Sequence, residues 1–114
     1  MFTKSAFFFI FIVLVNTFSL YSEGQDSLSL FKSLKEAATP QQKVKANISL
    51  AKYFLQKNIS KCFNYSSAAY LLAANIDDKK GMADATCVEG EAHFLQANFD
   101  EANLKFTEAL SLYK

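Results

Sequence analysis

From residue 25 onward the apolar side chains recur at helical intervals, and no stretch alternates apolar and polar residues over the length of a strand. Two segments carry this pattern most clearly. In the first, small and apolar residues repeat every three or four positions: Cys62, Tyr65, Ser66, Ala69, Leu72, Ala73 and Ile76. In the second, the same spacing joins Ala102, Phe106, Ala109, Leu110 and Tyr113. The periodicity predicts an all-α chain.

Capping and turn residues divide this region into about five helices. The first begins near Asp26 and ends before Thr39 and Pro40, because Thr39 is a good N-cap and Pro40 suits the first helical position. The second is expected over residues 41–56, and the third from residue 62 to 76 after a break at 58–60. A polar connector at 77–81 precedes a fourth helix at 82–96, and the fifth follows from residue 99.

The segment before residue 25 has a different character. Lys4 precedes an uninterrupted apolar run, residues 6–15, and small residues follow at Ser22 and Gly24. This is the three-part pattern of a secretory signal peptide, so we expect cleavage near Gly24 and export of residues 25–114 to the periplasm or the medium. The apolar run is shorter than the roughly 20 residues of a membrane-spanning helix. An uncleaved segment that anchors the chain in a membrane is the alternative.

The exported region repeats itself in pairs of helices. Ala51 aligns with Gly90, and Cys62 aligns with Ala102. The second interval is longer by one residue, and the extra residue falls in the turn between the two helices of a pair. Small residues therefore recur where the two helices of a hairpin would cross closely. The residues expected to pack the repeats together are Ala51, Cys62, Ala69, Gly90, Ala102, Phe106 and Ala109. Helix pairs at a fixed interval predict a stack of helix-turn-helix repeats, an α-solenoid.

At these positions the second unit resembles the tetratricopeptide repeat (TPR) family. Gly90 stands at the small residue of the family's first helix, and Ala102, Phe106 and Ala109 fit the Ala, aromatic and Ala positions of its second helix. The turn at residues 97–102, Ala-Asn-Phe-Asp-Glu-Ala, is similar to the family's Gly-Asp-aromatic-acidic-Glu-Ala turn. In contrast, Thr86, Glu89 and His93 depart from the family pattern.

The resemblance implies a domain plan for the whole chain. Residues 1–24 are the signal peptide, residues 25–39 a lead-in helix, and residues 40–114 two TPR-like repeats at about 41–77 and 81–114. The first repeat is the weaker match. Residues 69–85 are also similar to the long-helix repeats found in exported sensor regions of bacterial histidine kinases and regulators.

The resemblance also implies a binding surface, because the first helix of each TPR unit lines a concave face. By position this face should contain Lys45, Ile48, Lys52 and Leu55 from the first unit and Asp84, Cys87, Glu91 and Phe94 from the second. We therefore expect an exported protein–protein interaction module that holds a peptide, a partner protein or a neighbouring repeat. The alternative is the N-terminal sensory part of a longer signal-transduction protein, such as a histidine kinase or a transcriptional regulator.

The last predicted helix supports both interpretations. TPR-like arrays usually have three or more repeats and close with a helix that has a polar outer face. No such helix follows residue 113 in this sequence, so we expect Phe106, Leu110 and Tyr113 to be partly uncovered. Further repeats of the same chain would cover them, and so would self-association through this helix.

Composition and charge exclude several classes of function. The chain has 12 lysines, no arginine and a net charge of +1, without the basic stripe of a nucleic-acid-binding protein. One histidine and two cysteines are too few for the usual metal motifs. No Ser-His-Asp set or glycine-rich phosphate loop occurs, so we expect no catalytic residue, cofactor or metal.

Two features leave alternatives open. Cys62 and Cys87 would enter an oxidising compartment on export, and a bridge between them would suit a small secreted helical effector. A buried, small apolar role is the favoured interpretation of Cys62. Separately, residues 25–80 have a charge of +5 and residues 81–114 a charge of −4. This asymmetry favours docking of repeats or of a partner, unless it reflects only ordinary exposed helix faces.

Overall fold

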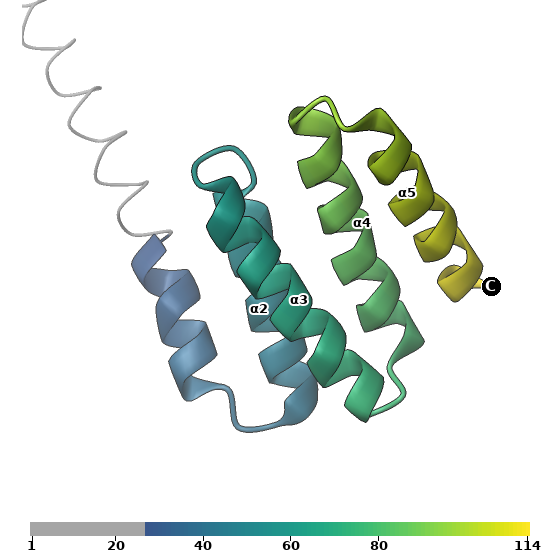
Figure 1. Cartoon of the computed structure of the whole chain (residues 1–114). Helices are drawn as coiled ribbons and strands as arrows, with labels where there is room; N and C mark the ends of the chain where they lie inside the picture. The colour runs from purple at the N-terminus through teal and green to yellow at the C-terminus, as the bar shows by residue number, and fades with distance from the viewer. Residues whose placement is uncertain (1–26) are drawn as a thin grey trace, which may run out of the picture.

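A computed structural model describes residues 27–114, so the predicted signal peptide lies outside the described residues. Within this range every regular element is a helix (Figure 1). A helix over residues 27–36, called here the leading helix, is followed by α2 (Pro40–Phe54), α3 (Ile59–Asn75), α4 (Lys79–Leu95) and α5 (Phe99–Tyr113). For residues 27–114, the prediction of an all-α fold with five helices is confirmed. None of the described helices is long and apolar enough to span a membrane.

Short polar side chains set where the helices begin. Thr39 Oγ1 accepts a hydrogen bond from the Gln42 backbone N–H at 3.2 Å, and Gln42 Oε1 accepts one from the Thr39 N–H at 3.3 Å. This reciprocal capping box satisfies two N–H groups that have no partner inside α2. Asn58 caps α3 in the simpler way, with Oδ1 accepting from the Lys61 N–H at 3.1 Å.

The start of α4 corrects one predicted boundary. The helix begins at Lys79 rather than at about residue 82. Residues 79–81, which were predicted to belong to the polar connector, therefore form the first turn of the helix. The reason is Asp78, whose Oδ1 accepts a hydrogen bond from the Gly81 N–H at 2.9 Å. A carboxylate at an N-cap pairs with a first-turn N–H that has no partner inside the helix and interacts favourably with the helix dipole.

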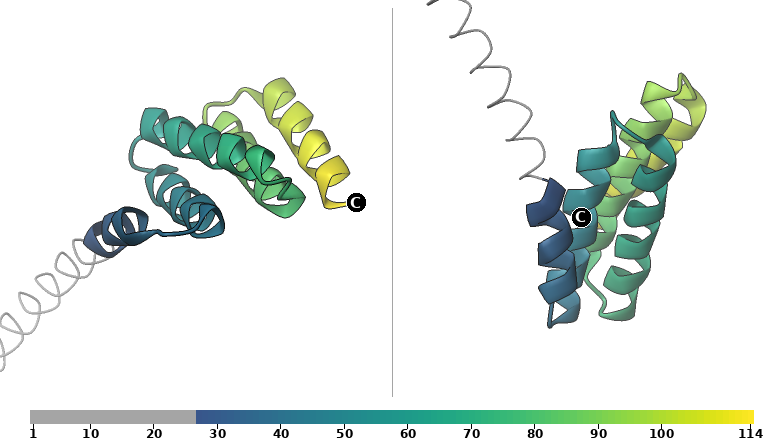
Figure 2. Two further views of the ribbon diagram at one scale, coloured as in Figure 1. Left: turned by 90° about the horizontal axis from the view of Figure 1, so that it is seen from below. Right: turned by 90° about the vertical axis from the view of Figure 1, so that its left-hand side faces the viewer.

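The helices are arranged as successive hairpins (Figures 1 and 2). The helices α2, α3 and α4 each pack against the next one in the chain, and α2 also packs against α4. In consequence α2 and α4 lie on one side of the stack, and α3 and α5 lie on the other. The helix starts repeat at the intervals that relate the aligned small residues, although the predicted starts did not. Pro40 and Lys79, which begin α2 and α4, are as far apart in the sequence as Ala51 and Gly90. The starts of α3 and α5 have the same spacing as Cys62 and Ala102.

The core forms where α2, α3 and α4 meet. One cluster joins Leu50, Ala51, Phe54, Cys62, Val88 and Ala92, and a second joins Val44, Ile48, Ala69, Ala73 and Ala85. The leading helix adds Leu30 and Leu34 to the first cluster. Both clusters therefore lie within α2 to α4, with the leading helix packed on their outer side, and α5 adds the buried Ala102 and Ala109.

Six of the seven residues predicted to pack the repeats are buried. They are Ala51, Cys62, Ala69, Gly90, Ala102 and Ala109. The seventh, Phe106, is partly exposed, but its ring lies directly over Gly90. A Cβ added at Gly90 would come 2.7 Å from Phe106 Cε1, well inside van der Waals contact. The absence of a side chain at Gly90 is therefore what lets the ring approach α4.

The turns at both ends of α4 share one geometry. Asp77 and Ala97 have positive φ angles of 53° and 63°. In each turn the next N–H reaches a carbonyl five residues back: Asp78 bonds to Ala73 and Asn98 to His93, both at 2.9 Å. This is the Schellman arrangement that ends many helices. No such residue occurs between α2 and α3, so the two units differ at the end of their first helices.

Candidate functional site

Two hollows lie along the side of the stack formed by α2 and α4. The first has a volume of about 540 Å³ and lies near the beginnings of both helices. Its wall is lined by Gln41, Val44, Lys45, Ile48, Ser49, Asp78, Lys80, Gly81 and Asp84. Because charged groups from both helices border it, we call it the polar hollow.

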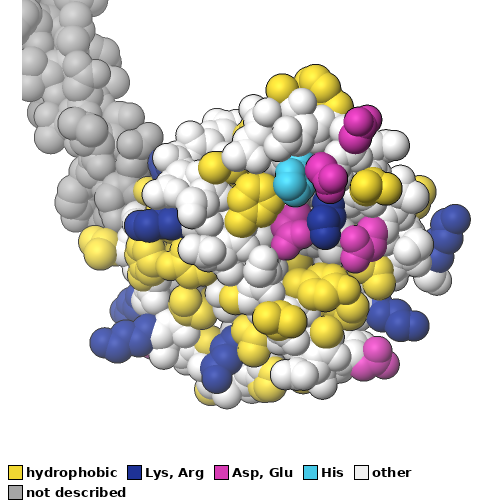
Figure 3. Space-filling view, viewed as in Figure 1, with side chains coloured by type: hydrophobic (Ala, Val, Ile, Leu, Met, Phe, Trp, Pro, Cys, Tyr) yellow, Lys and Arg dark blue, Asp and Glu magenta, His cyan; other side chains and the backbone are white. Residues whose placement is uncertain are grey.

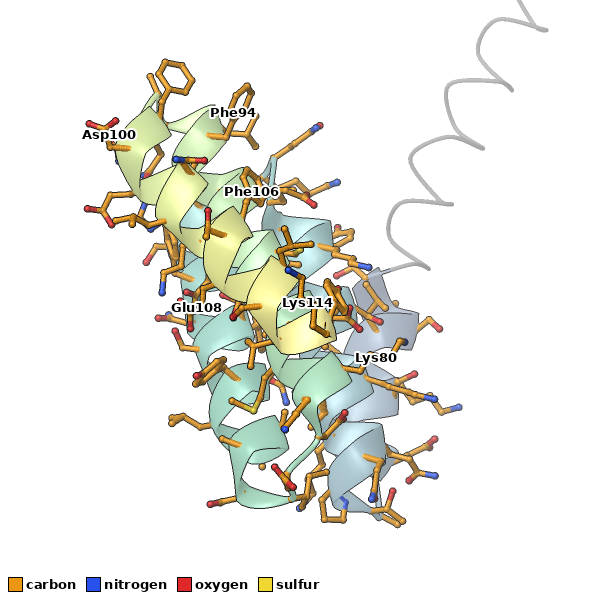
Figure 4. All side chains as sticks on the ribbon, turned by 90° about the vertical axis from the view of Figure 1, so that its right-hand side faces the viewer. Lys80, Phe94, Asp100, Phe106, Glu108 and Lys114 are labelled. Carbon is orange, nitrogen blue, oxygen red and sulfur yellow. The ribbon has the colours of Figure 1, made fainter. Side chains whose placement is uncertain are left out.

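The second hollow has a volume of about 340 Å³ and lies near the ends of α2 and α4, where α5 joins them. Leu55, Gln56, Glu91, Phe94, Leu95 and Phe106 line it. Four of these side chains are large and apolar, and Glu91 supplies a single carboxylate, so we call it the apolar hollow. Figure 4 shows Phe94 and Phe106 on one side of α5, with Asp100 and Glu108 on the other.

The residues predicted from the first unit are placed in three different ways. Lys45 is exposed in the wall of the polar hollow, and Leu55 is half-buried in the wall of the apolar hollow. Lys52 is exposed but lies beside Tyr53 and the leading helix, where it borders a shallower hollow.

Ile48 lies deeper than the other predicted residues. It lines the polar hollow, but only 8% of its surface is exposed. Its side chain belongs to the core cluster that joins α2 to α3 and α4. Ile48 therefore forms the floor between two helices of the chain itself, and it offers very little surface to a ligand.

The residues predicted from the second unit are also divided between the two hollows. Asp84 borders the polar hollow, accepts a hydrogen bond from the Tyr113 hydroxyl and lies 3.8 Å from Lys80 Nζ. Glu91 and Phe94 are exposed in the wall of the apolar hollow. Cys87 lines neither hollow and lies half-buried beside Tyr113. The structure thus brings six of the eight predicted residues to two hollows, and Lys52 and Cys87 lie outside them.

The contact between Asp84 and Tyr113 ties the last turn of α5 to α4. The hydrogen bond to Asp84 is the main cause that raises the pKa of the Tyr113 phenol, followed by burial and then the Asp84 charge. The neutral phenol donates to the carboxylate, and a phenolate would be repelled by it.

Sequence reasoning missed several residues of the apolar hollow. Leu95 and Gln56 line it, and the Phe94 ring packs on Phe99 with centroids 5.3 Å apart. A signal for these residues is present in the sequence. The segment 54–58, Phe-Leu-Gln-Lys-Asn, recurs at 94–98 as Phe-Leu-Gln-Ala-Asn. Aligning these segments matches the end of α2 with the end of α4. These two helix ends form the apolar hollow, so the alignment would have predicted its residues.

The cysteines and the histidine make packing contacts. Both thiols are free, and Cys62 is fully buried. Burial, with smaller contributions from Glu91 and Glu89, raises the Cys62 pKa to about 11, so this thiol stays protonated at neutral pH. The His93 ring packs on Phe63 with centroids 5.0 Å apart. Within residues 27–114, no three His, Cys, Asp or Glu side chains lie close enough together to hold a metal ion.

Charged contacts on the other side of α4 link it to both neighbours. Lys105 Nζ lies 3.3 Å from Glu89 and 3.7 Å from Glu108, and Ser67 donates a hydrogen bond to Glu89 at 3.3 Å. In Figure 3 several acidic side chains gather over the part of this face formed by α4 and α5. The charge difference noted in the sequence thus has a counterpart on the folded surface.

No protein-family model, curated protein or solved structure matches this chain.

Proposed function

We propose that this chain is an exported helical-repeat module of the TPR type that binds a protein or peptide segment along α2 and α4. In this proposal the module has no catalytic activity of its own. The observation that carries the proposal is the pair of hollows, which draws residues from both repeat units onto one side of the stack.

The two hollows differ in a way that suits an extended ligand. The polar hollow carries Lys45 and Asp84, whose charges fix the direction of a peptide more than they add affinity. The apolar hollow offers Phe94 and Phe106 as contacts for one buried aromatic or aliphatic side chain. Interfaces of this kind take most of their affinity from a few such anchors. We therefore propose a ligand with an apolar anchor next to charged residues.

The test is capture by crosslinking from the native source, followed by identification and reassembly of the pair from purified components. The variant Glu91→Ala/Phe94→Ala removes two exposed groups from the wall of the apolar hollow. We expect this variant to lower the affinity for a true partner by about tenfold or more, because each truncated anchor costs more than about 1 kcal/mol of binding free energy.

A matched control changes two exposed groups away from both hollows. Lys61→Ala/Leu71→Ala lies on α3 and should leave affinity unchanged. Equal binding by the two double variants would show that the partner uses another surface. A second variant, Lys45→Ala/Lys52→Ala, then tells whether the first repeat unit takes part.

A second candidate is the sensory region of a longer signal-transduction protein. The observation in its favour is the exposure of Phe106 and Leu110 on α5, which a following helix would cover. Reading the gene beyond the codon for Lys114 tests this directly. An immediate stop codon would remove this candidate, and an open frame that encodes a kinase or DNA-binding domain would support it.

A further inference from the structure

The repeat identifies a face of α5 that is open among the described residues. At the interval that relates Cys62 to Ala102, the α3 residues Ser66 and Ala73 correspond to Phe106 and Tyr113 of α5. Both α3 residues are 0% exposed in the packing against neighbouring helices, whereas Phe106 is 39% and Tyr113 is 49% exposed. Leu110, between them on the same side of the helix, is 59% exposed. We call Phe106, Leu110 and Tyr113 the open face.

Carboxylates of α4 border this face. Asp84 holds the Tyr113 hydroxyl at one end, and Glu91 lines the same hollow as Phe106 at the other. The open face belongs to the half of the chain, residues 81–114, whose charge is −4. A ligand for it should therefore present apolar side chains next to positive charges.

The leading helix has this combination. Leu28 is 71% exposed and Phe31 is 38% exposed. Lys32 and Lys35 follow them by one helical turn each, and both are exposed. This helix belongs to residues 25–80, whose charge is +5. It lies at the opposite end of the stack from α5 (Figure 1), so one molecule does not bring the two surfaces together.

From this complementarity we infer that the chain self-associates head to tail. The leading helix of a second copy docks on the open face, with Leu28 against Leu110 and the lysines toward Asp84 and Glu91. Pairing two open faces instead would bring together two halves of charge −4. Because the two docking surfaces differ, a dimer still has one free leading helix and one free open face. Assembly therefore continues past the dimer or closes into a ring.

Sedimentation velocity and light scattering test this from micromolar to millimolar concentration. The full chain and a form starting at Gln25 are compared, since both core clusters and the residues packed against them lie within residues 30–92. In low salt we expect the mass to rise past that of a dimer. High salt should weaken the association, because it screens charges that are not deeply buried.

Matched leucine variants locate the contact. Leu110→Asp and Leu28→Asp should each weaken association by about tenfold or more, as expected for losing one buried leucine. Leu71→Asp changes an equally exposed leucine on α3 and should have no effect. Leu28 borders neither the polar nor the apolar hollow, so its variant leaves the proposed partner surface intact.

Charge reversal tests the orientation. Lys32→Glu/Lys35→Glu and Asp84→Lys/Glu91→Lys should each weaken association, and a chain carrying all four changes should regain it. A mass that stays that of a monomer at every concentration would overturn the inference. This holds even if a helix other than that of a second copy covers the open face. A dimer that grows no further and is insensitive to Leu28→Asp would overturn it in favour of paired open faces.

Discussion

At the scale of single residues, Ala97 has a backbone conformation that suits glycine better. Its φ of 63° places it in the left-handed region, where a Cβ crowds the following carbonyl. It also stands where the TPR pattern has glycine, so the turn geometry gives a physical reason for that preference. We expect Ala97→Gly to raise the free energy of unfolding by roughly 1 kcal/mol, or Tm by about 4–8 °C. Urea or thermal unfolding followed by circular dichroism measures this.

The control is an alanine in ordinary helical backbone. Ala68 is half-buried in the middle of α3, and Ala68→Gly should lower stability by about 0.5–1 kcal/mol because glycine loses more backbone freedom on folding. Opposite signs for the two substitutions would confirm that the turn at Ala97 is strained. If Ala97→Gly also destabilised the chain, the left-handed conformation would not persist in solution.

At the scale of helices, the sequence predicted the elements better than their ends or their surfaces. Helical spacing is a property of the whole segment, so α3 and α5 could be recognised from their stripes of small residues. The start of α4 depends on the single Asp78 cap, and the run Lys79, Lys80, Gly81 has the composition of a connector. The surface residues depend on tertiary packing. Ile48 belongs to the apolar stripe of its helix, but how little of it stays exposed in the polar hollow depends on the packing of α3 and α4 on α2.

Docking of the α5 helix end gives a prediction about pH. The Tyr113 pKa is raised in the folded chain, so folding favours the neutral phenol. Its stabilising effect is fully present below the unfolded pKa of about 10 and is lost as pH rises through the higher folded value. Tyr113→Phe should lower stability at neutral pH by about 1 kcal/mol, a modest value because the group is half-exposed. The difference from wild type should shrink above about pH 10.

Removing the carboxylate isolates this effect from general alkaline unfolding. Asp84 accepts the hydrogen bond from the Tyr113 hydroxyl. In an Asp84→Ala background, Tyr113→Phe should therefore change the slope of stability against pH much less than it does in the wild-type chain. A pH-independent difference between wild type and Tyr113→Phe would mean that the contact with Asp84 does not form in solution.

At the scale of the whole molecule, a stack of hairpins should be most stable at its centre. In the described residues α4 packs against α2, α3 and α5, whereas α5 packs against α4 alone and the leading helix packs at the other end, with Phe31 against Phe54 and Tyr65. Stability in such stacks is approximately a sum of local and nearest-neighbour terms, so helices with fewer neighbours open more easily. Amide hydrogen exchange should then show the greatest protection in α4 and in the parts of α2 and α3 that face it.

The same exchange experiment connects local opening to assembly. Raising the protein concentration should increase protection in the leading helix and α5 and leave α3 unchanged, because head-to-tail docking supplies neighbours only at the two ends. The chain with Leu110→Asp is the control, and its exchange should not depend on concentration. Uniform protection across all helices in that monomeric variant would mean that the hairpins unfold as a single cooperative unit. A rise confined to α5 would point instead to pairing of open faces.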